Sequence, residues 1–318
     1  MLKKNNLIFL FKLFIFVALS YYIYITIPWG EVSKVIQSAS FNLIVLSICF
    51  QFISFILLAL RWNIIIRNSD LSIDFYEIFK ISLIGVAFNN ILPSSIGGDI
   101  VRGAYIVKKG ISIKNSLLSL ITDRVIGLLT ILVFICVFLT LNTEKNAILS
   151  DINIILILLF ISIILIMLIF KIRLINKIIE NFLFKNFNTG RFKKIFSIIP
   201  ELYQYTVNTT LVIKIILISV ATLVMEILVF WLASKSLGMN YSLYIFIIAV
   251  PLITIISALP ISLGGLLVRE ASGLYLLNLL GVDMIYASTI VILLIPIMII
   301  SSLPGLYYFL RNSHNEKS

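Results

Sequence analysis

The feature that most constrains this chain is an eleven-residue segment that occurs twice. Residues 92–102 read LPSSIGGDIVR and residues 259–269 read LPISLGGLLVR, with seven identical positions. The chain holds only 7 Pro and 14 Gly, so chance seldom aligns Pro-x-Ser-x-Gly-Gly with an Arg four residues on. The offset of 167 residues is about half of the 318-residue chain. A duplicated membrane protein shows this spacing.

Each copy of the segment breaks a helix inside an apolar stretch. Pro removes a backbone donor, and a Gly-Gly pair disfavours the helix. In a bilayer such a break is tolerated only where protein or a water-filled cavity satisfies the freed backbone groups. The repeat therefore indicates two broken helices at an internal site. A pair of Pro-kinked structural helices is the alternative interpretation.

The composition indicates a multi-pass membrane protein. Hydrophobic residues make up 61% of the chain, charged residues 12%, and the mean hydropathy is +1.13. The net charge of +11 does not indicate nucleic acid, because Lys and Arg lie in short loops and helix ends, where they set topology and contact anionic lipid. The two Cys lack metal-ligand spacing, and the only histidine, His314, lies in a polar tail. We expect no metal site, no cofactor and no histidine-based catalysis.

The apolar segments predict an all-α protein with about six full transmembrane helices and two re-entrant helical hairpins in an inverted repeat. The helices are expected at 7–27, 41–60, 116–140, 152–170, 209–234 and 284–310. The hairpins are expected at 77–115 and 242–282, and residues 171–208 are expected to form a basic cytoplasmic loop with an amphipathic helix on the membrane surface. Arg61 and Trp62 are expected to end the second helix at the membrane interface.

The distribution of cations predicts the orientation. With the N-terminus inside, 21 of the 25 Lys and Arg fall at or near the cytoplasmic side. The other four are Lys34, Lys145, Lys235 and Arg269. We expect a cell (inner, cytoplasmic) membrane location with both termini cytoplasmic. The two repeats, 1–140 and 141–318, each cross the membrane three times, so the second is predicted to be inverted.

The hairpin tips favour an anionic ligand. A helix that restarts after Gly97-Gly98 presents backbone amides and a positive dipole end, with Arg102 one turn further on. Arg269 holds the equivalent place after Gly264-Gly265, and Arg suits a phosphate diester because its donors form a planar fork. The alternative is that Arg102 faces the cytoplasmic interface as a topology charge. The substrate-binding residues expected beside these are Asn90, Pro93, Ser95, Asp99, Pro260, Ser262 and Glu270.

Other charged residues inside apolar segments are expected to pair or to couple transport. At a helix centre a carboxylate such as Glu226 costs about 2.5–3.5 kcal/mol. Glu226 has three open explanations: an ion pair with Arg269 or Arg102, a coupling proton, or a path to the interface. Asp123 and Arg124 are adjacent and so point to different faces of their helix, and either could reach a hairpin. Arg61 is placed with them as a charge-pair candidate.

These residues resemble the lysylphosphatidylglycerol synthase transmembrane family, also described as flippase-like integral membrane proteins. The resemblance rests on the paired motifs at 90–102 and 259–270, with further similarity at Arg61-Trp62 and Asp123-Arg124. It implies movement of aminoacylated phospholipids, or of other phosphate-bearing lipids such as polyprenyl-phosphate-linked lipids, between leaflets. One departure is Leu267, where the family usually has Gly. The bifunctional members of the family carry a large soluble catalytic domain, which we do not expect in a chain that stops at Ser318, so we expect no enzyme.

Three functional hypotheses remain. The leading one is a stand-alone lipid translocase whose partners are membrane lipids with anionic or phosphate headgroups. The second is the membrane subunit of a lipid-modifying or glycosyl-transferring enzyme whose catalytic domain is a separate chain. The third is a non-catalytic scaffold that uses the basic loop. The sequence offers no clustered carboxylate pair and no nucleotide-phosphate loop, which disfavours catalysis within this chain.

Overall fold

The computed structural model describes residues 4–67, 73–91, 97–142, 151–161, 209–258 and 267–315. All the regular structure in these ranges is helical. Four helices are long and apolar enough to cross a membrane: α3 (Phe41–Ile66), α6 (Ile113–Asn142), α10 (Thr209–Ser236) and α13 (Met284–Asn315). The bent pair α1 (Lys4–Thr26) and α2 (Trp29–Gln37) makes a fifth candidate, with 69° between its limbs. The protein is therefore an all-helical multi-pass membrane protein.

The sixth predicted span lies mostly outside the described residues. Of residues 152–170, the structure describes only the part within the short apolar helix Asp151–Ile161. The predicted surface helix in 171–208 also lies outside the described ranges. The arrangement of six spans and two hairpins therefore stays a prediction.

At each predicted hairpin the structure has a pair of helices that are shorter than the four spanning candidates. In the first half, α4 (Phe75–Ile91) is followed by α5 (Gly97–Lys108), and in the second half α11 (Leu243–Ala258) is followed by α12 (Val268–Leu279). The partners of each pair pack against one another. The described parts of α4 and α11 end at Ile91 and Ala258, directly before the two copies of the repeated segment. Gly97 and Gly98 belong to α5, so the expectation that the helix restarts after this Gly-Gly pair is wrong in the first copy. The order of long helix, broken pair and long helix thus occurs twice.

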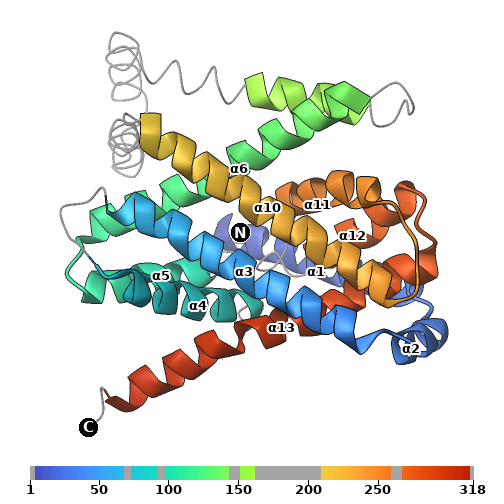
Figure 1. Ribbon diagram of the computed structural model, residues 1–318, viewed down its shortest axis with the longest axis horizontal. Coiled ribbons are helices and arrows are strands. Elements are labelled where there is room, and N and C mark those ends of the chain that lie inside the picture. The colour runs from blue at the N-terminus through green and yellow to red at the C-terminus, as the bar shows by residue number, and fades with distance from the viewer. Residues whose placement is uncertain are drawn as a thin grey trace.

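Two equivalent long helices run in opposite directions. The helices α3 and α10 lie side by side through the middle of the molecule (Figure 1) and pack extensively. The Ser40 amide before α3 donates to the Ser236 carbonyl at the end of α10 at 2.7 Å, so the start of one helix meets the end of the other. An inverted repeat requires this antiparallel relation of its corresponding helices.

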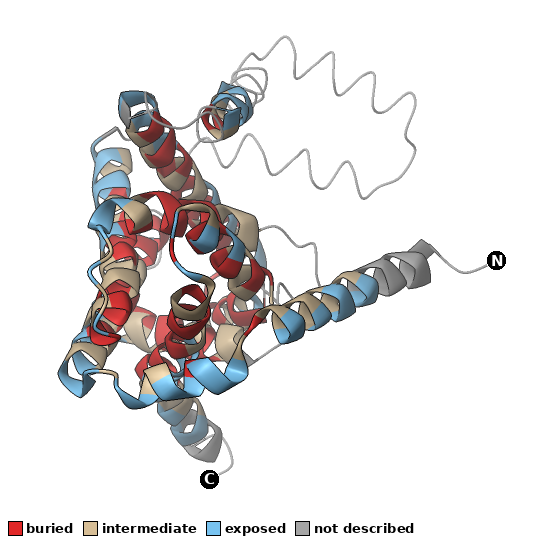
Figure 2. Cartoon of the chain, turned by 90° about the vertical axis from the view of Figure 1, so that its right-hand side faces the viewer, coloured by how far each residue is buried: buried red, intermediate tan, exposed pale blue. Residues whose placement is uncertain are grey.

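The two halves are interlocked. The helix α13 of the second half packs on α4, and α6 of the first half packs on α11. Gly305 of α13 is so close to α4 that a Cβ atom there would overlap the Leu83 backbone. The α1 helix instead projects from the bundle (Figure 2), and its Phe14, Tyr21 and Tyr24 side chains are exposed. This exposure fits a helix whose sides face lipid.

Candidate functional site

Five charged side chains converge where α3, α5 and α6 meet. Asp123 of α6 accepts from Arg61 of α3, with Nε 2.7 Å from Oδ1, and its other oxygen lies 3.5 Å from the Arg102 guanidinium of α5. Asp99 of α5 accepts from Arg102 at 3.2 Å and from Arg124 Nε of α6 at 2.6 Å. Three cations and two carboxylates therefore form one continuous network inside the membrane domain.

Helix geometry explains why neighbours in sequence take different partners. Successive residues of a helix point about 100° apart, so Asp123 is directed toward α3 while Arg124 is directed toward α5. The sequence left open which of the two reaches a hairpin. Both do, because Asp123 contacts Arg102 and Arg124 contacts Asp99.

Arg61 and Trp62 are buried, so the prediction that they end a helix at the interface is wrong. The α3 helix continues to Ile66, and Trp62 is fully buried. The Arg102 guanidinium lies over the Trp62 ring at 4.0 Å, and the indole nitrogen donates to Ser119 at 3.2 Å. The aromatic ring therefore stabilises the Arg102 guanidinium through a cation–π contact.

Arg102 is also buried, with 5% of its side chain exposed, so it is not a topology charge at the cytoplasmic interface. By contrast, 42% of the Arg124 side chain is exposed. Arg124 was expected to be a charge-pair residue. Its exposure makes it the guanidinium of this network that is most accessible to a ligand.

The first motif brings two backbones into close contact. A Cβ atom on Gly98 would overlap the Gly85 carbonyl oxygen, and one on Gly85 would lie 2.5 Å from Arg102 Cγ. The Gly98 amide donates to the Asn89 side chain at 2.7 Å. This amide was expected to serve an anion, but Asn89 of the preceding helix already satisfies it. Asn90 was predicted as a site residue from the motif, whereas Asn89 was not.

Asn90 has a different role. Its side-chain nitrogen donates to the Met298 carbonyl at 3.3 Å and to Ser302 Oγ at 3.1 Å, both on α13. It also lines the cavity described below. Asn90 therefore joins the first hairpin to the last long helix.

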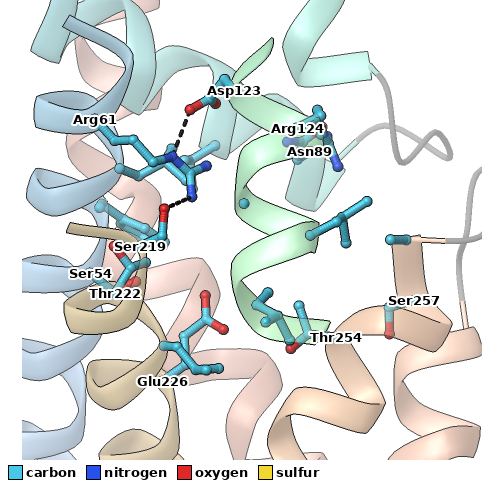
Figure 3. Close-up of a pocket in the computed structure, with 18 of the residues that line it drawn as sticks. Ser54, Arg61, Asn89, Asp123, Arg124, Ser219, Thr222, Glu226, Thr254 and Ser257 are labelled. Atoms are coloured by element: carbon cyan, nitrogen blue, oxygen red, sulfur yellow. Dashed lines mark hydrogen bonds and ion pairs between the residues drawn. The ribbon is translucent and has the colours of Figure 1, made fainter. Parts of the chain in front are cut away.

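The charged network forms one end of a cavity of about 320 Å³. Both halves of the chain line it, through α3, α4, α5 and α6 on one side and α10, α11 and α13 on the other. Figure 3 shows Arg61 and Asp123 at one end and Glu226 at the other, with Thr254 across from the carboxylate. The cavity is therefore polar at both ends.

Four hydroxyl residues that were not predicted as site residues line the cavity from two helices. They are Ser219 and Thr222 of α10 and Thr254 and Ser257 of α11. Residues 219, 222 and 226 follow one another at intervals of three and four, so they lie on one face of α10. Residues 254 and 257 are three apart and share one face of α11. This spacing was a signal that could have been read from the sequence.

A second hollow adjoins the cavity. A groove of about 760 Å³ runs between α5 and α6, and its lining is mostly apolar, including Ile100, Ala104, Leu117 and Ile121. The cavity and the groove share Asp99, Arg124, Leu128 and Ala258. The accessible guanidinium thus lies at the border between a polar and an apolar space.

The second motif does not repeat this arrangement. Arg269 pairs with Glu270, its neighbour in sequence, at 2.6 Å, and it also contacts Met298 Sδ. Neither Arg269 nor Glu270 is among the described residues that line the cavity. The described residues include no ion-pair partner for Glu226, so neither Arg269 nor Arg102 pairs with it there.

The predicted site residues Pro93, Ser95, Pro260, Ser262, Gly264 and Gly265 lie outside the described residues. Gly97 and Asp99 are buried at the start of α5. Within the described ranges there is no group of three His, Cys, Asp or Glu side chains that could hold a metal ion.

Comparison with known proteins supports the resemblance read from the motifs. A family model described as the lysylphosphatidylglycerol synthase TM region matches residues 9–305. A UPF0104 membrane protein of Methanothermobacter thermautotrophicus is 27% identical over 256 residues, which cover 74% of this chain and 75% of that protein. Another from Methanocaldococcus jannaschii is 27% identical over 271 residues, covering 80% and 78%. A third, from Pyrococcus horikoshii, is 25% identical over 133 residues, or 40% of each chain.

Proposed function

Because the chain belongs to the lysylphosphatidylglycerol synthase transmembrane-region family, we propose that it is a lipid translocase that moves a phosphate-bearing lipid between leaflets. The observation that carries this proposal is the junction between the polar cavity and the apolar groove. A lipid has a polar headgroup joined to hydrocarbon, and the two adjoining spaces offer both environments.

The headgroup phosphate binds at Arg124. The Arg124 Nε already donates to Asp99, and much of its side chain remains exposed at the cavity border. A guanidinium presents a planar fork of N–H donors that suits a phosphate. Arg102 and Arg61 are held by Asp99 and Asp123, and they supply positive potential behind Arg124.

A hydrocarbon chain of the lipid lies in the groove between α5 and α6. The exposed apolar side chains Ile100, Leu117 and Ile121 line this groove. Hydrocarbon in the groove avoids contact with the charged cavity while the headgroup crosses. The cation asymmetry of the sequence supports a cytoplasmic membrane location with both termini inside.

Leaflet exchange in proteoliposomes tests the proposal. The purified chain is reconstituted into vesicles that contain fluorescent phosphatidylglycerol, and dithionite quenching measures the label that reaches the outer leaflet. We expect Arg124→Gln to slow exchange about tenfold or more, because a charge-assisted hydrogen bond is lost. The exchange rate of Arg124→Lys should lie between those of the wild type and Arg124→Gln, because lysine keeps the charge but lacks the planar fork of donors. Asp99 keeps Arg102 as a partner in both variants.

The matched control is Lys34→Gln, which removes an exposed cation from α2, away from the cavity. It should exchange lipid at the wild-type rate. Wild-type protein that moves lipid no faster than empty vesicles, or an Arg124→Gln variant equal to wild type, would overturn the proposal.

The groove is tested by filling it. Ala104 lines the groove and is exposed, so Ala104→Phe places a ring in the path of the hydrocarbon chain. Exchange should fall while folding is retained. Val137→Phe adds a ring to an exposed position of α6 that does not line the groove, and it should have no effect. Equal rates for the two variants would remove the groove from the mechanism.

A further inference from the structure

Three described hydroxyls of the cavity lining on α10 and α11 offer hydrogen-bond acceptors to the cavity. The hydroxyls of Thr222, Thr254 and Ser257 each donate to a carbonyl of their own helix, at 2.8, 2.8 and 2.6 Å. Each hydroxyl has one proton, so what remains toward the cavity is an oxygen lone pair. Ser219 is engaged in the same way and already accepts from Arg61 at 3.2 Å.

Glu226 adds a carboxylate to these oxygens and has no cation of its own among the described residues. The nearby cation Arg61 is held by Asp123 at 2.7 Å, and Arg269 is held by Glu270 at 2.6 Å. An intramembrane carboxylate persists with a partner, a proton or a route to water. The carboxylate points into the cavity rather than along α10 to the interface (Figure 3).

The charge balance of the cavity also favours a bound cation. Its described lining carries three cations, Arg61, Arg102 and Arg124, and three carboxylates, Asp99, Asp123 and Glu226. With Glu226 ionised these charges cancel. A bound phosphate diester adds one negative charge, which is costly in a low-dielectric site unless a cation accompanies it.

We propose that Glu226, with the Thr254 hydroxyl across from it (Figure 3), forms a cation-binding subsite that is occupied together with the headgroup phosphate. The charge-balance step rests on the proposed function, whereas the acceptor lining does not. The ligand is a compact cation that bonds to oxygen. It is either free Na⁺, which takes carboxylate and hydroxyl oxygens as ligands, or the primary ammonium of a lipid headgroup, which has three donors.

Thermal unfolding of the full chain in detergent tests the subsite without any transport. The midpoint is followed by the fluorescence of the 3 Trp residues in NaCl, KCl or choline chloride at equal ionic strength. In a second arm the micelles carry phosphatidylethanolamine, whose ammonium has N–H donors, or phosphatidylcholine, whose trimethylammonium has none. We expect the occupied subsite to raise Tm by about 2–4 °C.

The matched variants are Glu226→Gln, which keeps the shape and removes the charge, and Glu31→Gln, which removes an exposed carboxylate in α2. The rise in Tm should vanish in Glu226→Gln and persist in Glu31→Gln. A rise with Na⁺ alone assigns the subsite to a free cation, and a rise with phosphatidylethanolamine alone assigns it to the headgroup. Both outcomes support the subsite.

The subsite is overturned if no salt or lipid changes Tm, or if Glu226→Gln responds as the wild type does. Should Glu226→Gln fail to fold, Thr254→Val decides, because it removes one cavity oxygen and keeps the side-chain shape. A weaker response of Thr254→Val supports the subsite, and an unchanged response overturns it. Because binding is read without transport, a chain that moves no lipid can still bind the cation, so the two proposals fail separately.

Discussion

Arg124 of α6 donates through Nε to Asp99 of α5 at 2.6 Å, and this contact fastens the returning limb of the first hairpin to the long helix that follows it. The pairing exists in one half only, because the position equivalent to Asp99 in the second copy is Leu266. The asymmetry makes the first hairpin the charged wall of the cavity.

A double-mutant cycle of Asp99→Asn and Arg124→Gln should measure this contact. We expect Asp99→Asn to destabilise the protein strongly, by about 3–5 kcal/mol, because it leaves the buried Arg102 short of a carboxylate. Arg124→Gln should cost less, since that side chain is partly exposed. The coupling between the two should be about 0.5–3 kcal/mol in unfolding experiments. Strictly additive effects would mean that the contact contributes nothing to stability.

Substitution of Gly98 should separate the limbs of the first hairpin. Gly98→Ala places a Cβ on the Gly85 carbonyl, where the backbone must move, and we expect a loss of about 1–3 kcal/mol in unfolding free energy. The control is Gly30→Ala in α2, where a Cβ meets nothing within 4 Å and helix propensity improves. If both variants are equally stable, the two limbs are further apart than described.

Leu267 is the residue that departs from the family motif, and it adopts the backbone conformation that glycine favours. Its φ is 66° and its ψ is −9°, at the position before α12. We expect Leu267→Gly to be tolerated, with relief of about 1 kcal/mol of strain offsetting the lost side-chain contacts. Leu267→Val should lower Tm, because a β-branched residue fits this conformation worse. A Leu267→Val protein as stable as Leu267→Gly would contradict the left-handed geometry.

The orientation is tested by labelling single cysteines in intact cells. Cys49 is exposed and is first replaced by Ala, while Cys136 is buried. A cysteine at Lys108, after the first hairpin, should react only with reagents that enter the cytoplasm. One at Asn240, after α10, should react with impermeant reagents from outside. Labelling of both from one side would exclude the inverted repeat.

The sequence predicted the helices well because each is a long apolar run bounded by loops, and because the two motif copies mark the breaks. The α11–α12 pair falls within the predicted hairpin at 242–282, and the α4–α5 pair matches the one at 77–115 except that α4 begins two residues earlier, at Phe75. The predicted end of α3 was wrong because a cation beside an aromatic residue usually marks the membrane interface. Here Arg61 pairs with Asp123 of α6, and Trp62 packs against Arg102 of α5, so both side chains are buried.

The site was predicted less completely. Arg102, Asp99, Asp123 and Arg124 were named from the motifs, but their pairing depends on how α5 rotates against α6, which no local pattern determines. Arg269 was expected to play the same part in the second half as Arg102 plays in the first. It does not line the cavity, and its guanidinium instead pairs with the neighbouring Glu270. The repeated motif led us to expect the same contacts for Arg102 and Arg269. The two arginines have different partners because Asp99 of the first copy and Glu270 of the second have no carboxylate counterpart in the other copy.

The cavity is walled by helices from both halves, which has a consequence for how such a protein could have arisen. A polypeptide of half this length holds one wall, with either the arginines of α3, α5 and α6 or the carboxylate of α10, and cannot surround a ligand. An origin by duplication and fusion would require two separate copies to meet in the membrane to enclose the cavity. Fusion would then allow each half to change separately, and Asp99 and Glu226 are carboxylates that one half has and the other lacks at the position 167 residues away.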